Sequence, residues 1–209
     1  MFRRQSLTFF YCIRTLVSTL FAMNTAFAAA VVGQTAPEIS LTDTSGKTVR
    51  LSDFKGKHVV LEWNNPGCPF VRKHYNTANM QTLQKEAAGK GVVWLAVNST
   101  EKMHTDYMTP QVLGKWMLEQ KASPTATLMD ESGDVGKAYG ARTTPHMYVV
   151  NPQGILVYAG GIDSIPSANT DDIKTATNYV RQTMNEVVAG KAVSTPTTRP
   201  YGCSVKYKS

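Results

Sequence analysis

The stretch His58-Val-Val-Leu-Glu-Trp-Asn-Asn-Pro-Gly-Cys-Pro-Phe-Val71 decides the fold that we expect for this chain of 209 residues. It opens with a nearly continuous apolar run, which is typical of a strand buried on both faces. An Asn-Asn-Pro-Gly turn ends that run, and Pro69 suits the first position of a helix. The sequence therefore predicts a buried strand, a turn and a helix that continues to about Ala88, with Cys68 at the junction.

Segments on both sides of this stretch predict more strands and helices. We expect hairpins within 38–51 and 146–159, a second buried strand at 91–97, and helices at 109–120, 134–139 and 171–188. Residues 190–209 contain prolines and glycines and are expected to form an extended tail over the surface. A strand-helix-strand crossover makes parallel neighbours, whereas a hairpin makes antiparallel ones. The sequence therefore predicts an α/β fold in which helices flank a mixed central sheet with an N-terminal β-hairpin.

The composition is that of a folded domain with a mildly basic surface. Hydrophobic residues make up 42% of the chain and charged residues 18%, which excludes a disordered protein. The formal net charge is +7. However, the sequence has no cluster of lysine and arginine interleaved with aromatic residues, so nucleic-acid binding is not expected.

The first 28 residues have the pattern of an export signal. Arg3 and Arg4 precede an apolar run, and Ala26-Phe-Ala28 fits the small-x-small cleavage rule. A membrane anchor is the alternative, but the apolar run is shorter than the roughly 20 residues that a spanning helix needs. We therefore expect a Sec-type signal peptide at 1–28 that is cleaved after Ala28, and a periplasmic or secreted domain at 29–209 with no membrane anchor.

Removal of this segment discards Cys12 and leaves two cysteines, Cys68 and Cys203. In an oxidising compartment such a pair is a candidate disulfide. Three interpretations of Cys203 stay open. It is a resolving thiol on a mobile tail that attacks a mixed disulfide formed at Cys68, one half of a permanent structural disulfide, or a free thiol.

The residues around Cys68 favour a nucleophilic thiolate. The N-terminal end of a helix stabilises negative charge, and Arg72, Lys73 and His74 add cations on the next turn. Such a run more often forms the solvated face of a helix. Glu62 lies within the buried strand, where it is either a proton acceptor or a carboxyl group hydrogen-bonded to a neighbour. The histidines have no ligand spacing with either cysteine, so we expect neither a metal nor an organic cofactor.

Three segments resemble a known family. Residues 60–71, with Asn-Asn-Pro-Gly-Cys-Pro-Phe-Val, and residues 140–158, with Arg-Thr-Thr-Pro before an apolar strand, resemble the thioredoxin-like superfamily. The most similar branch is the redoxin or peroxiredoxin-like group of AhpC/TSA type, and the ending Tyr-Gly-Cys-Ser-Val-Lys-Tyr at 201–207 also resembles that branch. The resemblance covers roughly residues 31–207 and implies a thioredoxin-like fold.

The resemblance also implies roles for single residues. Cys68 stands where thioredoxins have their nucleophilic cysteine, and Glu62 stands where they have a buried acid. Pro145 matches the cis-proline beside that sulfur, and the backbone of Thr144 would pair with an incoming substrate strand. We therefore expect substrate contacts at Pro69, Thr144 and Pro145, and catalytic roles for Cys68, Glu62 and Cys203, with a Cys68–Cys203 disulfide as the oxidised form.

Two departures from the family limit these implications. Val71 replaces the second cysteine of Cys-x-x-Cys, and the peroxiredoxin motif Pro-x-x-x-Thr/Ser-x-x-Cys is absent before Cys68. We therefore expect an exported thiol–disulfide oxidoreductase that acts on a thiol or disulfide protein or a small oxidant and takes electrons from a partner protein. The alternatives are a thiol peroxidase and, from another class, a non-catalytic thioredoxin-fold adaptor or chaperone.

Overall fold

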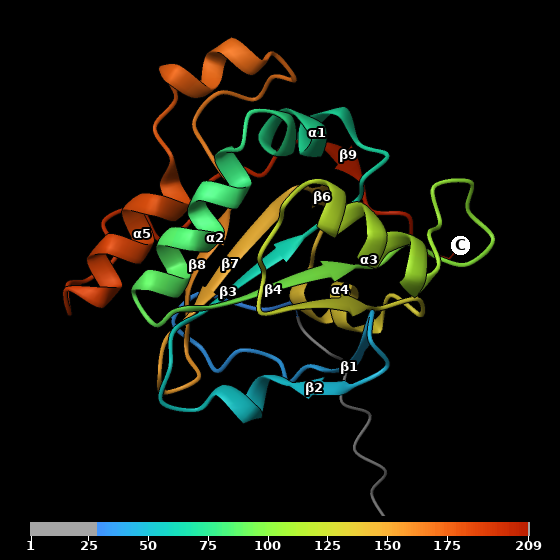
Figure 1. Ribbon diagram of the computed structural model, residues 1–209. Coiled ribbons are helices and arrows are strands. Elements are labelled where there is room, and N and C mark those ends of the chain that lie inside the picture. The colour runs from blue at the N-terminus through green and yellow to red at the C-terminus, as the bar shows by residue number, and fades with distance from the viewer. Residues whose placement is uncertain (1–28, 209) are drawn as a thin grey trace, which may run out of the picture.

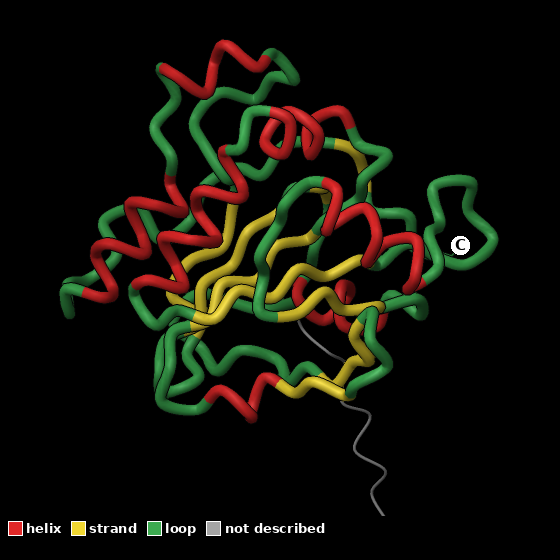
Figure 2. Tube along the Cα trace, in the orientation of Figure 1, coloured by secondary structure: helices red, strands yellow, loops and turns green. Residues whose placement is uncertain are grey.

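The computed structural model describes residues 29–208, so the expected signal peptide at 1–28 and its cleavage site lie outside the described residues. A seven-stranded sheet forms the centre of the molecule, and a two-stranded sheet lies beside its first helix (Figure 1). The strands are sandwiched between helices and loops (Figure 2). Within 29–208, no helix combines the length and the apolar character that crossing a membrane requires.

The central sheet is mixed, as the sequence predicts. In spatial order its strands are β2 (Thr48–Arg50), β1 (Ser40–Asp43), β5 (Ala126–Met129), β4 (Val93–Asn98), β3 (Val59–Trp63), β7 (His146–Val150) and β8 (Leu156–Gly160). β3, β4 and β5 are parallel, whereas β7 runs antiparallel to β3, and β1 runs antiparallel to both β5 and β2. The small second sheet pairs β6 (Thr143–Thr144) with β9 (Cys203–Ser204).

The helices divide between the two faces of the sheet. The described residues form α1 (Pro69–Asn76), α2 (Asn79–Gly89), α3 (Pro110–Glu119), α4 (Asp134–Tyr139) and α5 (Tyr179–Val188), with short 3-10 helices η1 (Leu51–Phe54) and η2 (Thr170–Lys174). Buried residues of α1, α2, α3 and α5 share one apolar core with the sheet, and α4 packs into a second core on the other face. The reactive thiol predicted at Cys68 therefore starts a helix on the four-helix face.

Strand β3 confirms the predicted buried strand, because all five of its residues are buried. Successive side chains of a strand point to opposite faces. Leu61 and Trp63 accordingly enter the core beside α4, and Glu62 points the other way, beneath α1 and α2. This alternation is what places a carboxyl group inside the four-helix core.

The single helix predicted from Cys68 to Ala88 is wrong, because the structure divides it into α1 and α2. Ala78 adopts a left-handed conformation (φ 58°) between the two helices. The Thr77 hydroxyl donates to the carbonyl of Lys73 at 2.7 Å, and the Gln81 amide donates to that of Tyr75 at 2.9 Å. These side chains replace the backbone donors that a continuous helix would have supplied.

Two other sequence predictions differ from the structure. The helix expected at 171–188 begins only at Tyr179, because the side chain of Asn178 caps it by accepting the N–H of Arg181 at 2.9 Å. Strand β5 was not predicted, since its four residues show no clear alternation of apolar and polar side chains. It is a strand because β4 and β1 supply hydrogen-bonding partners on both sides.

Candidate functional site

The backbone around Cys68 is shaped by its own loop. Cys68 is the N-cap residue of α1, with Pro69 at the first helical position, as predicted. The Cys68 N–H donates to the carbonyl of Asn65 at 3.0 Å, while the Asn65 side chain accepts the N–H of Gly67 at 2.7 Å. Arg72 donates from Nε to the carbonyl of Pro66 at 2.8 Å. Arg72 therefore holds the turn that presents the cysteine.

The sulfur of Cys68 faces the loop that the sequence analysis singled out. Its Sγ donates to the carbonyl of Thr144 at 3.0 Å, and the Thr144–Pro145 peptide bond is cis. Cys68 is only 2% exposed. The structure thus brings Cys68, Pro69, Thr144 and Pro145 together, in the arrangement that the family resemblance implies.

Cys203 reaches the same point from the opposite end of the chain. In the β6–β9 pair Cys203 lies opposite Thr144, and its N–H donates to the Cys68 sulfur at 3.4 Å. Both cysteines are free thiols in the structure. A mobile tail was expected, but here the tail is a strand bound to the cis-proline loop.

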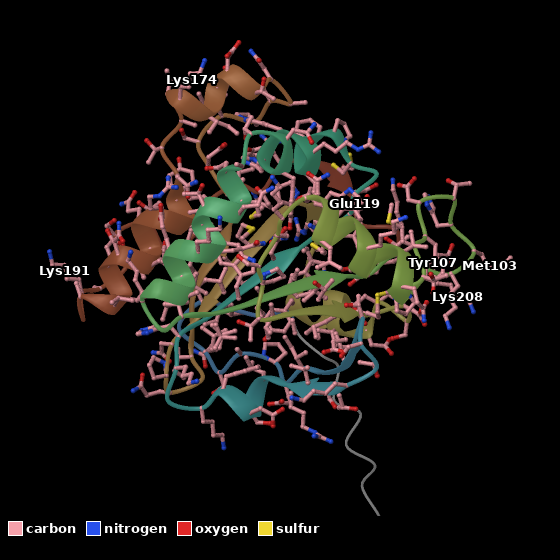
Figure 3. The ribbon with its side chains drawn as sticks, viewed as in Figure 1. Met103, Tyr107, Glu119, Lys174, Lys191 and Lys208 are labelled. Atoms are coloured by element: carbon pink, nitrogen blue, oxygen red, sulfur yellow. The ribbon has the colours of Figure 1, made fainter. Side chains whose placement is uncertain are left out.

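Hydrogen bonds also hold the tail beyond Cys203. The N–H of Val205 donates to the carbonyl of Arg142 at 3.0 Å, and the hydroxyl of Tyr207 donates to that of Ala141 at 2.8 Å. The N–H of Glu101 donates to the carbonyl of Lys206 at 2.9 Å. In Figure 3 the end of the tail at Lys208 is seen on the same side of the molecule as Met103 and Tyr107, which belong to the loop before α3.

The two thiols are not equivalent. Burial raises the pKa of Cys203 to about 12, and its hydrogen bond to Cys68 and the negative charge of that sulfur add to the shift. Cys203 is therefore a protonated thiol at neutral pH.

Glu62 is buried, as predicted, within a network of donors. Its carboxylate accepts hydrogen bonds from the side chains of Asn64, Tyr75 and Trp94, each at 2.8 Å, and from Gln84 at 3.4 Å. Burial raises the pKa of Glu62, although these hydrogen bonds act in the opposite direction. Within the described residues, Cys68 is not among the hydrogen-bonding partners of Glu62.

The solvated helix face considered for Arg72, Lys73 and His74 is confirmed only for Arg72. Lys73 and His74 are buried, and the Lys73 Nζ lies 3.7 Å from the Asp163 carboxylate. Burial, with the charge of Lys73, lowers the pKa of His74 to about 3, so the expected cation is a neutral ring. Sequence reasoning missed Asp163 and Tyr201, whose hydroxyl donates to Asp163.

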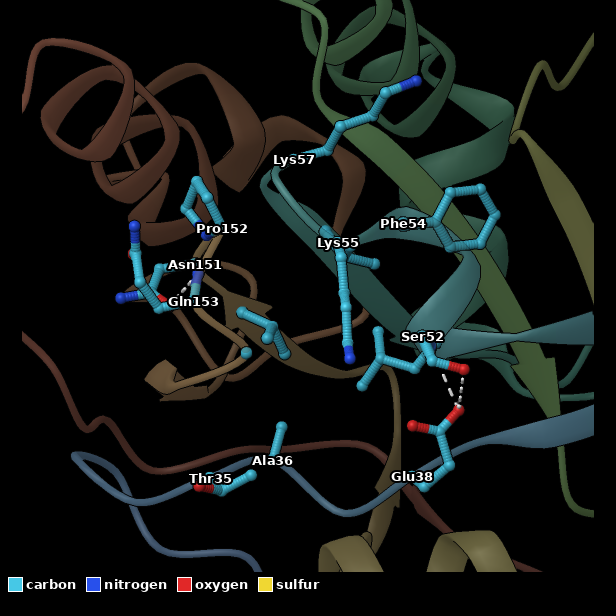
Figure 4. A pocket seen from close by; sticks show the side chains of 14 residues that line it. Thr35, Ala36, Glu38, Ser52, Phe54, Lys55, Lys57, Asn151, Pro152 and Gln153 are labelled. Atoms are coloured by element: carbon cyan, nitrogen blue, oxygen red, sulfur yellow. Dashed lines mark hydrogen bonds between the residues drawn. The ribbon is translucent and has the colours of Figure 1, made fainter.

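Other parts of the described chain offer no comparable chemistry. A pocket of about 470 Å³ lies between the η1 segment and the β7–β8 turn, where Ser52 donates to Glu38 (Figure 4). None of its lining residues belongs to the cysteine site. Among residues 29–208, no three His, Cys, Asp or Glu side chains are grouped as a metal site would require.

A buried cysteine at the start of α1 lies opposite a cis-proline loop and a second thiol, on a thioredoxin-like fold. The chain is a thiol-dependent oxidoreductase. The sequence profile of the AhpC/TSA family matches residues 32–159, and the chain belongs to that family.

Individual relatives agree with this assignment. Thiol-disulfide oxidoreductase ResA of Bacillus thuringiensis subsp. konkukian is 29% identical over 126 residues, which are 60% of this chain and 67% of the relative. An uncharacterized conserved protein from Geobacillus kaustophilus is 28% identical with a TM-score of 0.72, over 85% of this chain and 93% of that one. A thiol:disulfide interchange protein from Bacteroides sp. is 27% identical with a TM-score of 0.51, over 62% and 81%. The predicted family and fold are confirmed.

Proposed function

We propose that this chain is an exported thiol–disulfide oxidoreductase in which Cys68 is the nucleophile and Cys203 the resolving thiol. The observation that carries the proposal is the 3.4 Å contact between the Cys203 N–H and the Cys68 sulfur. Two residues that are 135 positions apart in sequence meet at the cis-proline loop. The names of the ResA and thiol:disulfide interchange relatives support the reaction class.

In the first step the Cys68 thiolate attacks one sulfur of a substrate disulfide. A bond forms between Cys68 and that sulfur, the substrate S–S bond breaks, and the other substrate sulfur leaves as a thiolate that takes up a proton. The N-terminal end of α1 directs positive charge at the attacking sulfur, and before a substrate binds the N–H of Cys203 also donates to this sulfur. Pro69 and the backbone of Thr144 and Pro145 are the proposed substrate contacts.

In the second step Cys203 loses its proton and attacks the Cys68 sulfur. The substrate thiol is released, and Cys68 and Cys203 become a disulfide that an external dithiol protein reduces. The charge on Cys68 contributes to the raised pKa of Cys203, and the mixed disulfide removes that charge. The pKa of Cys203 therefore falls at the stage at which Cys203 must act as a nucleophile. Glu62 is the proposed proton acceptor.

Serine variants test both roles with a model disulfide substrate and mass spectrometry. We expect Cys68→Ser to have no activity toward disulfides or peroxides. Cys203→Ser should stop after one turnover with substrate covalently bound to Cys68. Repeated turnover of Cys203→Ser at the parent rate would show that Cys203 does not resolve, and activity of Cys68→Ser would remove the proposed nucleophile.

Membership of the AhpC/TSA family favours thiol peroxidase activity as the second candidate. Peroxide would oxidise Cys68 to a sulfenic acid with release of water or an alcohol, and Cys203 would then condense with it, releasing water. Stopped-flow oxidation separates the candidates, since a rate no faster than that of free cysteine excludes the peroxidase. A redox titration that finds no Cys68–Cys203 couple between about −300 and −100 mV would instead favour the adaptor or chaperone.

A further inference from the structure

The tail carries a tyrosine that is seated in a buried charged cluster. Tyr201 is 9% exposed, and its hydroxyl donates to the Asp163 carboxylate. His74 Nε2 lies 3.3 Å from the same hydroxyl, and Lys73 Nζ lies 5.8 Å from the centre of the Tyr201 ring. Phe70, two residues after Cys68, packs edge-on against that ring at 5.9 Å. One side chain of the tail thus contacts three residues from the helix that begins at Cys68.

The tail supplies one of the hydrogen bonds that satisfy the polar groups of this cluster. Lys73 and Asp163 side chains are 0% and 3% exposed, and their charged atoms are 3.7 Å apart. A buried ion pair stabilises a fold only when additional hydrogen bonds satisfy its remaining groups. The Tyr201 hydroxyl supplies such a bond to Asp163. Withdrawal of the tail would leave Asp163 with one partner fewer inside the core.

The residue after Tyr201 fits only as glycine. Gly202 has φ +138°, and a Cβ atom at this position would lie 2.1 Å from the carbonyl oxygen of Thr144. That oxygen is also the acceptor for the Cys68 sulfur. The tail backbone and the reactive thiol therefore meet at the same atom, which ties the position of Cys203 to that of Cys68.

We propose that Tyr201 and Gly202 are positioning residues that hold Cys203 against Cys68 and close the tail over the reactive thiol. The inference deepens the proposed function and rests on it where Cys203 acts as the resolving thiol. Tyr201 anchors the strand before Cys203, and the Val205 and Tyr207 hydrogen bonds anchor it afterwards. A substrate strand reaches β6 only when β9 has left it.

The first test measures how well the tail shields Cys68 from a small reagent, and it does not depend on whether Cys203 is the resolving thiol. In a Cys203→Ser background, the rate at which iodoacetamide alkylates Cys68 is compared with that in proteins that also carry Tyr201→Phe or Gly202→Ala. Loss of a hydrogen bond to a charged group predicts an increase of about tenfold for Tyr201→Phe. Gly202→Ala should accelerate the reaction more, because its Cβ has no space beside Thr144.

The second test measures the position of Cys203 when both cysteines are present. Exchange of the Cys68–Cys203 disulfide with two molecules of glutathione gives two protein thiols and one oxidised glutathione, and its equilibrium constant reports the effective concentration of Cys203. That value should fall about tenfold in Tyr201→Phe. A role confined to global stability would leave this equilibrium unchanged.

Two control variants match these changes away from the site. Tyr139→Phe removes a buried hydroxyl that donates to the carbonyl of Pro37, on the other face of the sheet. Gly190→Ala replaces a glycine with φ +69° whose Cβ position is open. Both controls should leave alkylation and exchange at parent values.

The possible results separate the two proposals. Unchanged alkylation of Cys68 in both test variants would overturn the positioning role. If Cys203→Ser turns over like the parent but Tyr201→Phe still accelerates alkylation, Cys203 is not the resolving thiol. The tail would still be shown to shield Cys68.

Discussion

Two buried histidines make the folded state sensitive to acid. Burial lowers the pKa of His74 from 6.5 to about 3, with a further effect of Lys73, and burial lowers that of His146 equally, with a further effect of Arg142. In each histidine, Nδ1 faces a hydrogen-bond donor, as a neutral ring requires. His74 Nδ1 lies 2.8 Å from the Asn79 amide, and His146 Nδ1 accepts the N–H of Arg142 at 3.3 Å.

The magnitude follows from proton linkage. Below pH 6.5 an unfolded histidine binds a proton that the folded one does not, so the free energy of unfolding falls as pH decreases from 6.5 toward 3. At about pH 5 this loss is about 2 kcal/mol for each histidine. This loss of stability depends little on the pKa of the histidine in the folded state, because pH 5 lies well above that pKa. Together the pair costs about 4 kcal/mol, which is a large part of the stability of a typical domain.

Two buried carboxyl groups act in the opposite direction. Burial raises the pKa values of Glu62 and Asp130, so each favours the folded state as pH falls toward the ordinary carboxyl range. The parent protein therefore shows the sum of opposed effects. Only variants that remove one histidine at a time isolate its contribution.

The assay is urea unfolding followed by tryptophan fluorescence at about pH 7.5 and about pH 5. Between these two conditions His74→Gln and His146→Gln should each lose about 2 kcal/mol less than the parent, and the double variant about 4 kcal/mol less. Any constant destabilisation by the substitution cancels in this difference. A variant that loses as much stability as the parent would refute the assignment of a neutral buried ring at that position.

Three more predictions concern the carboxyl network and export. Glu62→Gln should slow disulfide reduction about 100-fold in single-turnover measurements, as loss of a general base does, and an unchanged rate would remove Glu62 from the reaction. Trp94→Phe removes a hydrogen bond that lowers the pKa of Glu62, so the pH profile of activity should shift to higher pH. An unchanged pH profile would show that the protonation of Glu62 does not control the rate. Expression of the full chain in a Gram-negative host should yield a mature protein that begins at Ala29 by intact mass, whereas a mass that includes residues 1–28 would contradict the signal peptide.

Local sequence patterns predicted most of the secondary structure. The apolar run before Cys68 predicted the buried strand β3, and the Thr109-Pro pair predicted the start of α3, where the Thr109 side chain accepts the N–H of Val112. These elements are set by burial and by capping within a few residues. Strand β5 was not predictable in the same way, because its partners β4 and β1 lie far away in the chain and compensate for a weak local preference. The break at Ala78 was missed because no glycine or proline marks this left-handed residue.

The candidate site was predicted in part. Cys68, Thr144 and Pro145 were identified from sequence, and the structure places the first two in contact. The cluster around Tyr201 was missed, because Lys73 and His74 have the sequence pattern of a polar helix face and their buried partners Asp163 and Tyr201 lie far away in the chain. The available signal was Gly202 in the Tyr-Gly-Cys run at 201–203, since glycine is the usual residue where the backbone approaches another group closely.

The sequence by itself determined the buried strands β3 and β4, the start of α3, the place of a thiol at the start of α1 and the carboxyl group inside β3, because these depend on periodicity and neighbouring residues. Only the tertiary structure decided which groups meet. It pairs β9 with β6, buries Lys73 beside Asp163, and sets Cys203 against Cys68. Contacts between residues far apart in the chain depend on how the whole sheet folds, and no local pattern specifies them.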